Sequence, residues 1–239
     1  MKKNYYDEEL PFGSKELRLP RELRRPLLKH LQELKSKYLE QNWGKASGFG
    51  KRPALIVVDL ARLWTDPSTQ MGTVLDSVVE ATCCVLEAAR NVKIPIFFTA
   101  LAYEPRVLLN NFKIDWHLTG DPHQLFELDP RLKRRSSESI IYKRYASAFK
   151  GTPLLQLLAA QGIDTLIVTG VSTSHCIYAT CRDAVESFRV IVPEEAVGER
   201  CEIMHRVNLL DIEIDLGDVL STQEVVKHVQ NLKNFAPPQ

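Results

Sequence analysis

The chain has 239 residues, of which 44% are hydrophobic and 26% are charged, and its formal net charge at pH 7 is +1. This composition is typical of a globular protein, and the balanced charge argues against a chain built to bind nucleic acid or a membrane surface. No apolar run approaches the roughly 18 residues of a membrane span. The first residues lack the apolar stretch of a signal peptide, so we expect a cytoplasmic protein.

The first 50 residues differ from the rest, because they are charged and show no strand pattern. Apolar side chains within them recur at helical spacing, at Leu27, Leu28, Leu31, Leu34 and Tyr38. The spacing predicts one amphipathic helix, followed by a linker that contains several glycines. We therefore divide the chain into an N-terminal arm with its linker, residues 1–50, and one domain, residues 51–239.

From residue 53 onward, strand-like and helical patterns alternate. Apolar runs typical of strands lie at 53–59, 94–100, 138–142, 164–170 and 188–193, with a weaker one at 217–220. Helical patterns lie at 74–91, 152–161, 175–187, 200–209 and 221–233. Near-continuous Val, Ile and Leu indicate strands buried on both faces. We predict a three-layer αβα, Rossmann-like fold with a six-stranded, mostly parallel sheet, and a functional loop in the long interruption at 101–136.

Three reactive side chains follow predicted strands. Asp59 follows L-I-V-V, Lys143 follows the run at 138–142, and Cys176 lies in the turn V-S-T-S-H-C after the run at 164–170. Ligands bind at the carboxyl ends of parallel strands, so we expect the three side chains to converge. Cys176 would then be a nucleophile and Asp59 its general base, while Lys143 would stabilise the thiolate and keep Asp59 ionised.

Each of these residues also has a structural interpretation. A cysteine between a strand and a helix is often a small buried apolar residue, the aspartate can cap a turn, and the lysine can lie on the surface. If Cys176 begins a helix, the helix dipole should lower the pKa of its thiol. His175 points about 100° away from its neighbour on a helix, so we expect it to face solvent or to support the site indirectly.

The cysteine content indicates reduced thiols and no structural metal. The number is odd and no Cys-x-x-Cys pair or zinc-ligand spacing is present; the cysteines are Cys83, Cys84, Cys176, Cys181 and Cys201. We interpret Cys83, Cys84 and Cys181 as packing residues. A redox sensor that pairs Cys176 with Cys181 or Cys201 remains an alternative.

Three motifs carry a resemblance to a known family. Asp59 after L-I-V-V, the block K-R-Y-A-S-A-F-K-G-T from Lys143, and G-V-S-T-S-H-C-I-Y-A-T from Gly170 are similar to the isochorismatase-like cysteine hydrolases, over about residues 48–233. Within that superfamily the chain looks most like the N-carbamoylsarcosine amidase-like amidohydrolases. The features behind this narrower resemblance are L-W-T-D-P at 63–67, E-E-A-V-G-E-R at 194–200, N-L-L-D-I at 208–212 and G-D-V-L-S-T at 217–222.

The resemblance implies a role for each motif residue. Asp59, Lys143 and Cys176 would form the catalytic triad, and a cis peptide bond would join Val171 to Ser172. The backbone N–H groups of Ser172 and Cys176 would form the oxyanion hole. The residues expected to bind substrate are Arg200, which would hold a carboxylate, with Trp64 and Thr173.

The activity implied is hydrolysis of a small carbamoyl or amide compound, with release of ammonia through a covalent acyl- or carbamoyl-enzyme. No cofactor or metal is expected, because no histidine follows the first strand as it does in the metal-binding nicotinamidases. Members of the family form homo-oligomers, so we expect a dimer or a homotetramer.

Two departures from the family pattern stand out: Ala61 replaces a frequent Gln, and no Gly separates Ser187 from Phe188. Maleamate-type or biuret-type amides remain alternative substrates. A non-catalytic member of the family remains an alternative function.

Overall fold

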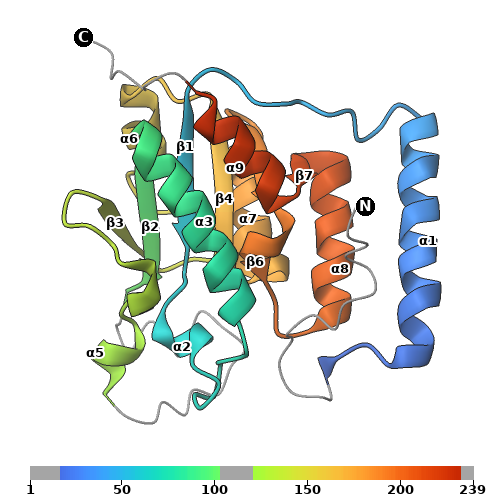
Figure 1. The fold of residues 1–239 in the computed structure, drawn as a ribbon, viewed down its shortest axis with the longest axis horizontal. Coiled ribbons are helices and arrows are strands. Elements are labelled where there is room, and N and C mark those ends of the chain that lie inside the picture. The colour runs from blue at the N-terminus through green and yellow to red at the C-terminus, as the bar shows by residue number, and fades with distance from the viewer. Residues whose placement is uncertain (1–16, 103–120, 233–239) are drawn as a thin grey trace.

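A parallel β-sheet lies between two layers of helices at the centre of the molecule (Figure 1). The computed structural model describes residues 17–102 and 121–232. The strands are β1 (Pro53–Val58), β2 (Ile96–Leu101), β3 (Ser139–Lys143), β4 (Thr165–Val171), β5 (Arg189–Pro193), β6 (Val197–Gly198) and β7 (Asp218–Leu220). Their order is β3-β2-β1-β4-β5-β7, with β6 beside β4, and all the pairs are parallel. The predicted three-layer fold is confirmed, with seven strands in place of six.

Both faces of the sheet are covered by apolar side chains. On β1, Leu55 and Val57 pack into the core beneath α3 (Asp76–Val92) and α9 (Thr222–Gln230). The alternate residues of β1 pack into the opposite core with α6 (Leu154–Ala160) and α7 (Tyr178–Ala184). Burial on both faces explains why the strand sequences are almost uninterrupted runs of Val, Ile and Leu.

The sheet forks at β4. The first half of β4 pairs with β5, and its last residues, Gly170 and Val171, pair with β6. Between β5 and β6 the chain makes only a short 3₁₀ turn, η4 (Glu194–Ala196). Because Val171 pairs with Gly198, the residues that follow β6 emerge beside the turn that follows β4. This second partner strand was not predicted, since two residues show no periodicity.

The helices around the site differ from the predicted ones in detail. The segment predicted as a helix at 175–187 begins with a π-helical turn, η3 (Thr173–Ile177), which continues into α7. The helix predicted at 200–209 is α8 (Glu202–Asp211), followed by a second π turn, η5 (Ile212–Leu216). Short helices that were not predicted include η4, α2 (Arg62–Thr65), α5 (Pro122–Leu125) and η2 (Pro130–Leu132). Residues 103–120 of the predicted 101–136 loop lie outside the described residues.

The predicted arm helix is present as α1 (Arg21–Glu40), which runs alongside α8 beyond the edge of the sheet (Figure 1). The linker that follows it is fixed to the domain by backbone N–H groups. Those of Ser47 and Gly48 donate to the carboxylate of Asp218, at 3.0 and 2.6 Å, and those of residues 51 and 52 donate to Asp164. None of the described helices is long and apolar enough to cross a membrane.

Candidate active site

Asp59, Lys143 and Cys176 meet at the carboxyl edge of the sheet. Asp59 follows β1, Cys176 lies in η3 after β4, and Lys143 is the last residue of β3. The sheet order reverses between β1 and β4, which is where parallel sheets bind ligands. The Nζ atom of Lys143 lies 2.6 Å from Oδ2 of Asp59 and donates to Sγ of Cys176 at 3.5 Å. The predicted convergence is therefore present.

Asp59 is held in place by Thr99 of β2. The Thr99 hydroxyl donates to Oδ1 of Asp59 at 2.8 Å, and the Thr99 carbonyl accepts the Asp59 N–H at 3.1 Å. Asp59 has φ 53°, a left-handed backbone conformation that residues other than glycine rarely adopt. Together these features aim one carboxylate oxygen at Thr99 and the other at Lys143. Sequence reasoning missed Thr99, whose role follows from its pairing beside Val58.

Lys143 is a buried cation with a complete set of partners. Its side chain is fully buried, and Nζ also donates to the carbonyls of Tyr145 and Ala146, at 3.0 and 2.9 Å. Burial disfavours the charge and is the largest single effect, but the charges of Asp59 and Cys176 and the hydrogen bonds to both together outweigh it, and the pKa of Lys143 is raised. The alternative of a surface lysine is wrong.

Cys176 is a buried thiol, and its pKa is shifted in the direction opposite to the expected one. Burial and the negative charge of Asp59 raise the pKa of Cys176 to about 12, and Lys143 offsets only part of the effect. The residue is 5% exposed, so desolvation outweighs any field from the short helical turn. The prediction of a lowered pKa is therefore wrong. The resting group is a thiol, which needs a base beside it to become a nucleophile.

The turn after β4 is held by backbone and side-chain hydrogen bonds. The peptide bond between Val171 and Ser172 is cis, at the position that the family resemblance implies. The N–H groups of His175 and Ile177 donate to the Ser172 carbonyl, at 2.9 and 3.1 Å. The amides of Ser172 and Cys176 are the pair to which the resemblance assigns the oxyanion hole.

Thr173 anchors this turn to the body of the protein. Its hydroxyl oxygen lies 3.0 Å from the Gly198 carbonyl oxygen and 2.8 Å from Nδ1 of His205. Burial, with the positive charge of Arg206, lowers the pKa of His205 to about 3, so its ring is neutral. Thr173 is fully buried and is not among the described residues that line the cavity above Cys176, so its contact with substrate stays a prediction.

A cavity of about 260 Å³ lies above Cys176. One part of its wall is apolar and comes from Trp64, Met71, Leu75 and Leu101. Another part is polar and comes from Ser174, His175, Glu199 and Arg200. The predicted residues Trp64 and Arg200 therefore share one cavity with the thiol, and His175 is solvent-exposed, as expected. A cavity with this wall suits a small molecule with an apolar body and an anionic group.

Glu199 is a cavity residue that sequence reasoning missed. It is 4% exposed, and its carboxylate accepts the N–H of Ser174 at 3.0 Å, the Ser174 hydroxyl at 2.6 Å and the Arg200 N–H at 2.9 Å. Glu199 thus ties the segment that carries Arg200 to the turn that carries Cys176. The sequence offered one signal for it, which is that Glu199 directly precedes the predicted substrate-binding residue Arg200 in V-G-E-R.

Two further expectations from the sequence are reduced thiols and no structural metal. All five cysteines are free thiols. Within residues 17–102 and 121–232, no three His, Cys, Asp or Glu side chains gather in a way that could hold a metal ion.

The chain is similar to known hydrolases in sequence and in fold. Residues 53–224 match the model of the isochorismatase domain. N-carbamoylsarcosine amidase from an Arthrobacter species is 34% identical over 208 residues, which are 83% of this chain and 79% of that protein. Maleamate amidohydrolase from Pseudomonas putida is 34% identical over 201 residues, 80% of this chain and 92% of that protein. The crystal structure of N-carbamoylsarcosine amidase from Thermoplasma acidophilum shares the fold, with a TM-score of 0.60 and 24% identity over 72% of this chain and 96% of that one.

Proposed function

The chain belongs to the isochorismatase family and is a hydrolase of C–N bonds in linear amides, and we propose that it uses Cys176 to release ammonia from a small carboxylated amide or carbamoyl compound. The observation that carries the proposal is the contact set of Lys143, whose Nζ touches both Asp59 and Sγ of Cys176 beneath the cavity. Nucleophilic catalysis requires an activated thiol, and here an acid and a cation are buried beside the thiol at one edge of the sheet.

The first half of the reaction forms a covalent intermediate. Asp59 accepts the thiol proton as Sγ of Cys176 attacks the carbonyl carbon of the substrate. The N–H groups of Ser172 and Cys176 donate to the oxyanion that develops. Asp59 then gives the proton to the departing nitrogen, the C–N bond breaks, and ammonia leaves an acyl- or carbamoyl-enzyme behind.

The second half releases the product. Asp59 takes a proton from a water molecule, whose oxygen attacks the same carbon. The C–S bond breaks, and the proton returns to Sγ of Cys176. Lys143 keeps its charge throughout and prevents Asp59 from taking up a proton before the thiol delivers one.

Arg200 supports a substrate that carries a carboxylate. Arg200 is one of the polar residues that line the cavity, and a guanidinium binds a carboxylate with two parallel hydrogen bonds. Compounds like N-carbamoylsarcosine are the first candidate substrates. Maleamate-like amides are the second, although the sequence identity to the known enzymes is 34% for both. Biuret has no carboxylate for Arg200. A non-catalytic protein would have no use for three buried, mutually contacting reactive groups.

The test is ammonia release from N-carbamoylsarcosine, maleamate and biuret by the wild type, Cys176→Ala and Arg200→Ala. We expect no turnover by Cys176→Ala. Arg200→Ala should raise KM for the two carboxylated compounds by about tenfold or more, since a hydrogen bond to a charged group contributes about 1.5–3 kcal/mol. Arg182→Ala is the matched control, because Arg182 is exposed and pairs with Asp215. Equal ammonia release by the wild type and Cys176→Ala ends the proposal, and so does wild-type failure on the whole panel.

A further inference from the structure

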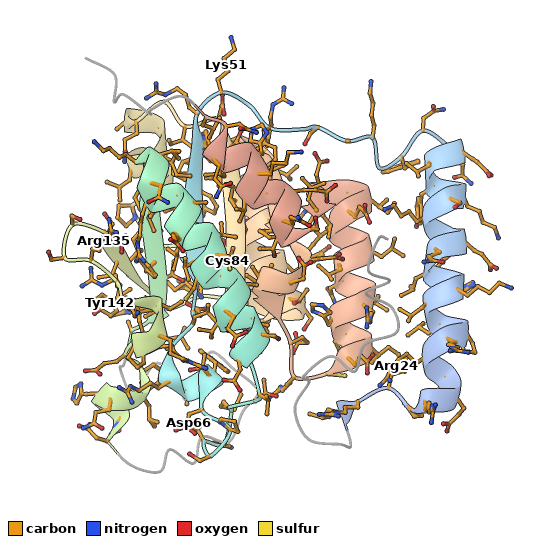
Figure 2. All side chains as sticks on the ribbon, in the orientation of Figure 1. Arg24, Lys51, Asp66, Cys84, Arg135 and Tyr142 are labelled. Atoms are coloured by element: carbon orange, nitrogen blue, oxygen red, sulfur yellow. The ribbon has the colours of Figure 1, made fainter. Side chains whose placement is uncertain are left out.

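The N-terminal arm contacts the domain close to Arg200, although it lies outside the residues that match the family model. Two donor groups of Arg24 reach the carboxylate of Glu202: Nε at 3.0 Å from Oε1, and Nη2 at 3.1 Å from Oε2. The Leu19 N–H donates to Oε2 at 3.0 Å. Figure 2 shows Arg24 in the space between the neighbouring ends of α1 and α8. The arm is therefore joined to the start of α8 by a two-point ion pair.

Glu202 depends on these partners. It is the first residue of α8 and is 1% exposed, so its carboxylate is almost cut off from water. Its other charged neighbour, Arg206, has Nη2 at 3.5 Å from Oε1. A buried carboxylate that loses its charge partner is strongly destabilised. Without Arg24, Glu202 loses its two-point ion pair and keeps the more distant Arg206, so we expect the first turn of α8 to shift toward water.

The start of α8 is also tied to the turn after β4 that carries Cys176, residues 172–177, which we call the nucleophile turn. The contacts lie on both sides of Arg200. Before Arg200, the Gly198 carbonyl accepts the Thr173 hydroxyl, and Glu199 accepts two hydrogen bonds from Ser174. After Arg200, Nδ1 of His205 lies 2.8 Å from the Thr173 hydroxyl oxygen. His205 follows Glu202 by three positions, so both lie on one side of the helix. A displacement of Glu202 would reach Arg200 and the turn that holds Cys176.

We infer that the arm is a positioning element of the active site: Arg24, through Glu202, fixes the start of α8 and with it Arg200 and the nucleophile turn. Arg24 is a positioning residue, since it touches none of the reacting groups. The part of the inference that concerns Arg200 rests on the proposed function, whereas the part that concerns the nucleophile turn does not. A helix that only packed on the surface would have no reason to form an ion pair with a buried carboxylate two residues after Arg200.

The test compares full-length Arg24→Ala and Arg24→Lys with the wild type. Lys35→Ala is the matched control, because Lys35 also joins the arm to the domain through an ion pair, with Glu213, but at η5. Two quantities are measured for each variant. The first is the steady-state kinetics, KM and kcat, for the carboxylated amides N-carbamoylsarcosine and maleamate and for the uncharged amide biuret. The other is the rate of Cys176 modification by iodoacetamide, followed by mass spectrometry of the Cys176 peptide, which needs no substrate.

We expect Arg24→Ala to raise KM for carboxylated amides by about fivefold or more, to raise KM for the uncharged amide much less, and to change the Cys176 rate by about threefold or more. Arg24→Lys, which keeps the charge but has a single donor nitrogen, should fall between Arg24→Ala and the wild type. Lys35→Ala should stay within about twofold of the wild type in both quantities.

The inference is overturned if Arg24→Ala has the KM and the Cys176 modification rate of the wild type. It is also overturned if Lys35→Ala changes both as much as Arg24→Ala does. Thermal unfolding of each variant shows whether it is folded. If Arg24→Ala is not folded, wild-type values for Arg24→Lys overturn the inference. If the wild type turns over no amide, the proposed function fails, and the Cys176 rate alone then decides whether the arm positions the nucleophile turn.

Discussion

Cys176 lies between the negative charge of Asp59 and the positive charge of Lys143, and the balance between them decides its protonation. Lys143 forms its closest contact with Asp59, at 2.6 Å, and lies 3.5 Å from Sγ. The cation therefore stabilises the carboxylate more than it stabilises a thiolate. This arrangement keeps the thiol protonated at rest, and in the proposed reaction Asp59 accepts that proton during attack.

The pH dependence of Cys176 alkylation tests this balance. With a pKa of about 12, the thiolate fraction rises about tenfold for each pH unit. We expect the iodoacetamide rate at Cys176 to rise from about pH 7 to about pH 10 without a plateau, whereas an ordinary thiol, with a pKa of about 8.5, levels off. In Asp59→Asn, the charge that raises the pKa is gone and Lys143 remains, so the plateau should appear at lower pH. A wild-type plateau near neutral pH would show a resting thiolate and contradict this description.

The positions of the reactive residues were predictable, but their surroundings were not. Asp59, Lys143 and Cys176 follow strands, and parallel strands end at a common edge. Thr99 and Glu199 act through the pairing of neighbouring strands, which no local pattern records. The pKa direction was wrong for a related reason: the helix-dipole argument uses only the local turn, whereas burial and Asp59 come from distant parts of the chain.

At the scale of single elements, β4 carries a strong local constraint at Gly170. Gly170 has φ 115°, and a Cβ atom placed on it would lie 2.0 Å from the carbonyl oxygen of Val58 in β1. The residue also directly precedes the Val171–Ser172 peptide that begins the nucleophile turn. Close approach of β4 to β1 at this point therefore requires glycine.

Gly170→Ala should reduce the free energy of unfolding by about 3 kcal/mol or more, because both the backbone conformation and the contact with β1 are lost. Gly48→Ala is the matched control. It also has a positive φ, 63°, but no atom lies within 4 Å of an added Cβ, so the expected loss is only about 1 kcal/mol. Urea denaturation of both variants measures the two values. Equal losses would mean that the Val58 contact is relieved by a small shift of the strands.

The six predicted strand runs correspond to real strands because buried parallel strands have an unmistakable composition. Their bounds differ by one or two residues, as for β2, which begins at Ile96 in place of residue 94. Short elements escaped prediction. The two residues of β6 and the four residues of α2 are too few for a period, and their conformations depend on the strands and helices around them.

At the scale of the molecule, the described part of the arm is fixed on both sides of α1. Leu19 and Arg24 bind Glu202, and the linker after α1 binds Asp218 and stacks Phe49 on His228 of α9, with ring centroids 3.7 Å apart. Helix α1 thus spans between two anchors on the same domain. The division of the chain at residue 50 and the expected dimer or tetramer stay predictions.

Removal of the second anchor should expose the linker. In Asp218→Ala, the N–H groups of Ser47 and Gly48 lose their acceptor, so trypsin should cleave after Lys45 about fivefold faster or more, because cleavage follows local opening. Asp215→Ala is the control, since the exposed Asp215 carboxylate pairs with Arg182 on α7. The measurement is the time course of the cleaved fragment by mass spectrometry. Equal cleavage rates in the two variants would show that Asp218 does not hold the linker.

The fork at β4 has a consequence for how new specificities can be obtained. The groups proposed to break the bond come from the ends of β1, β3 and β4, whereas Arg200 arrives on the chain that leaves β6. Selection for another amide can therefore act on the residues after Glu199 while the acid, the cation and the thiol keep their places. Under the proposed function, a library limited to Arg200 would change which molecule is bound and would leave Asp59, Lys143 and Cys176 unaltered.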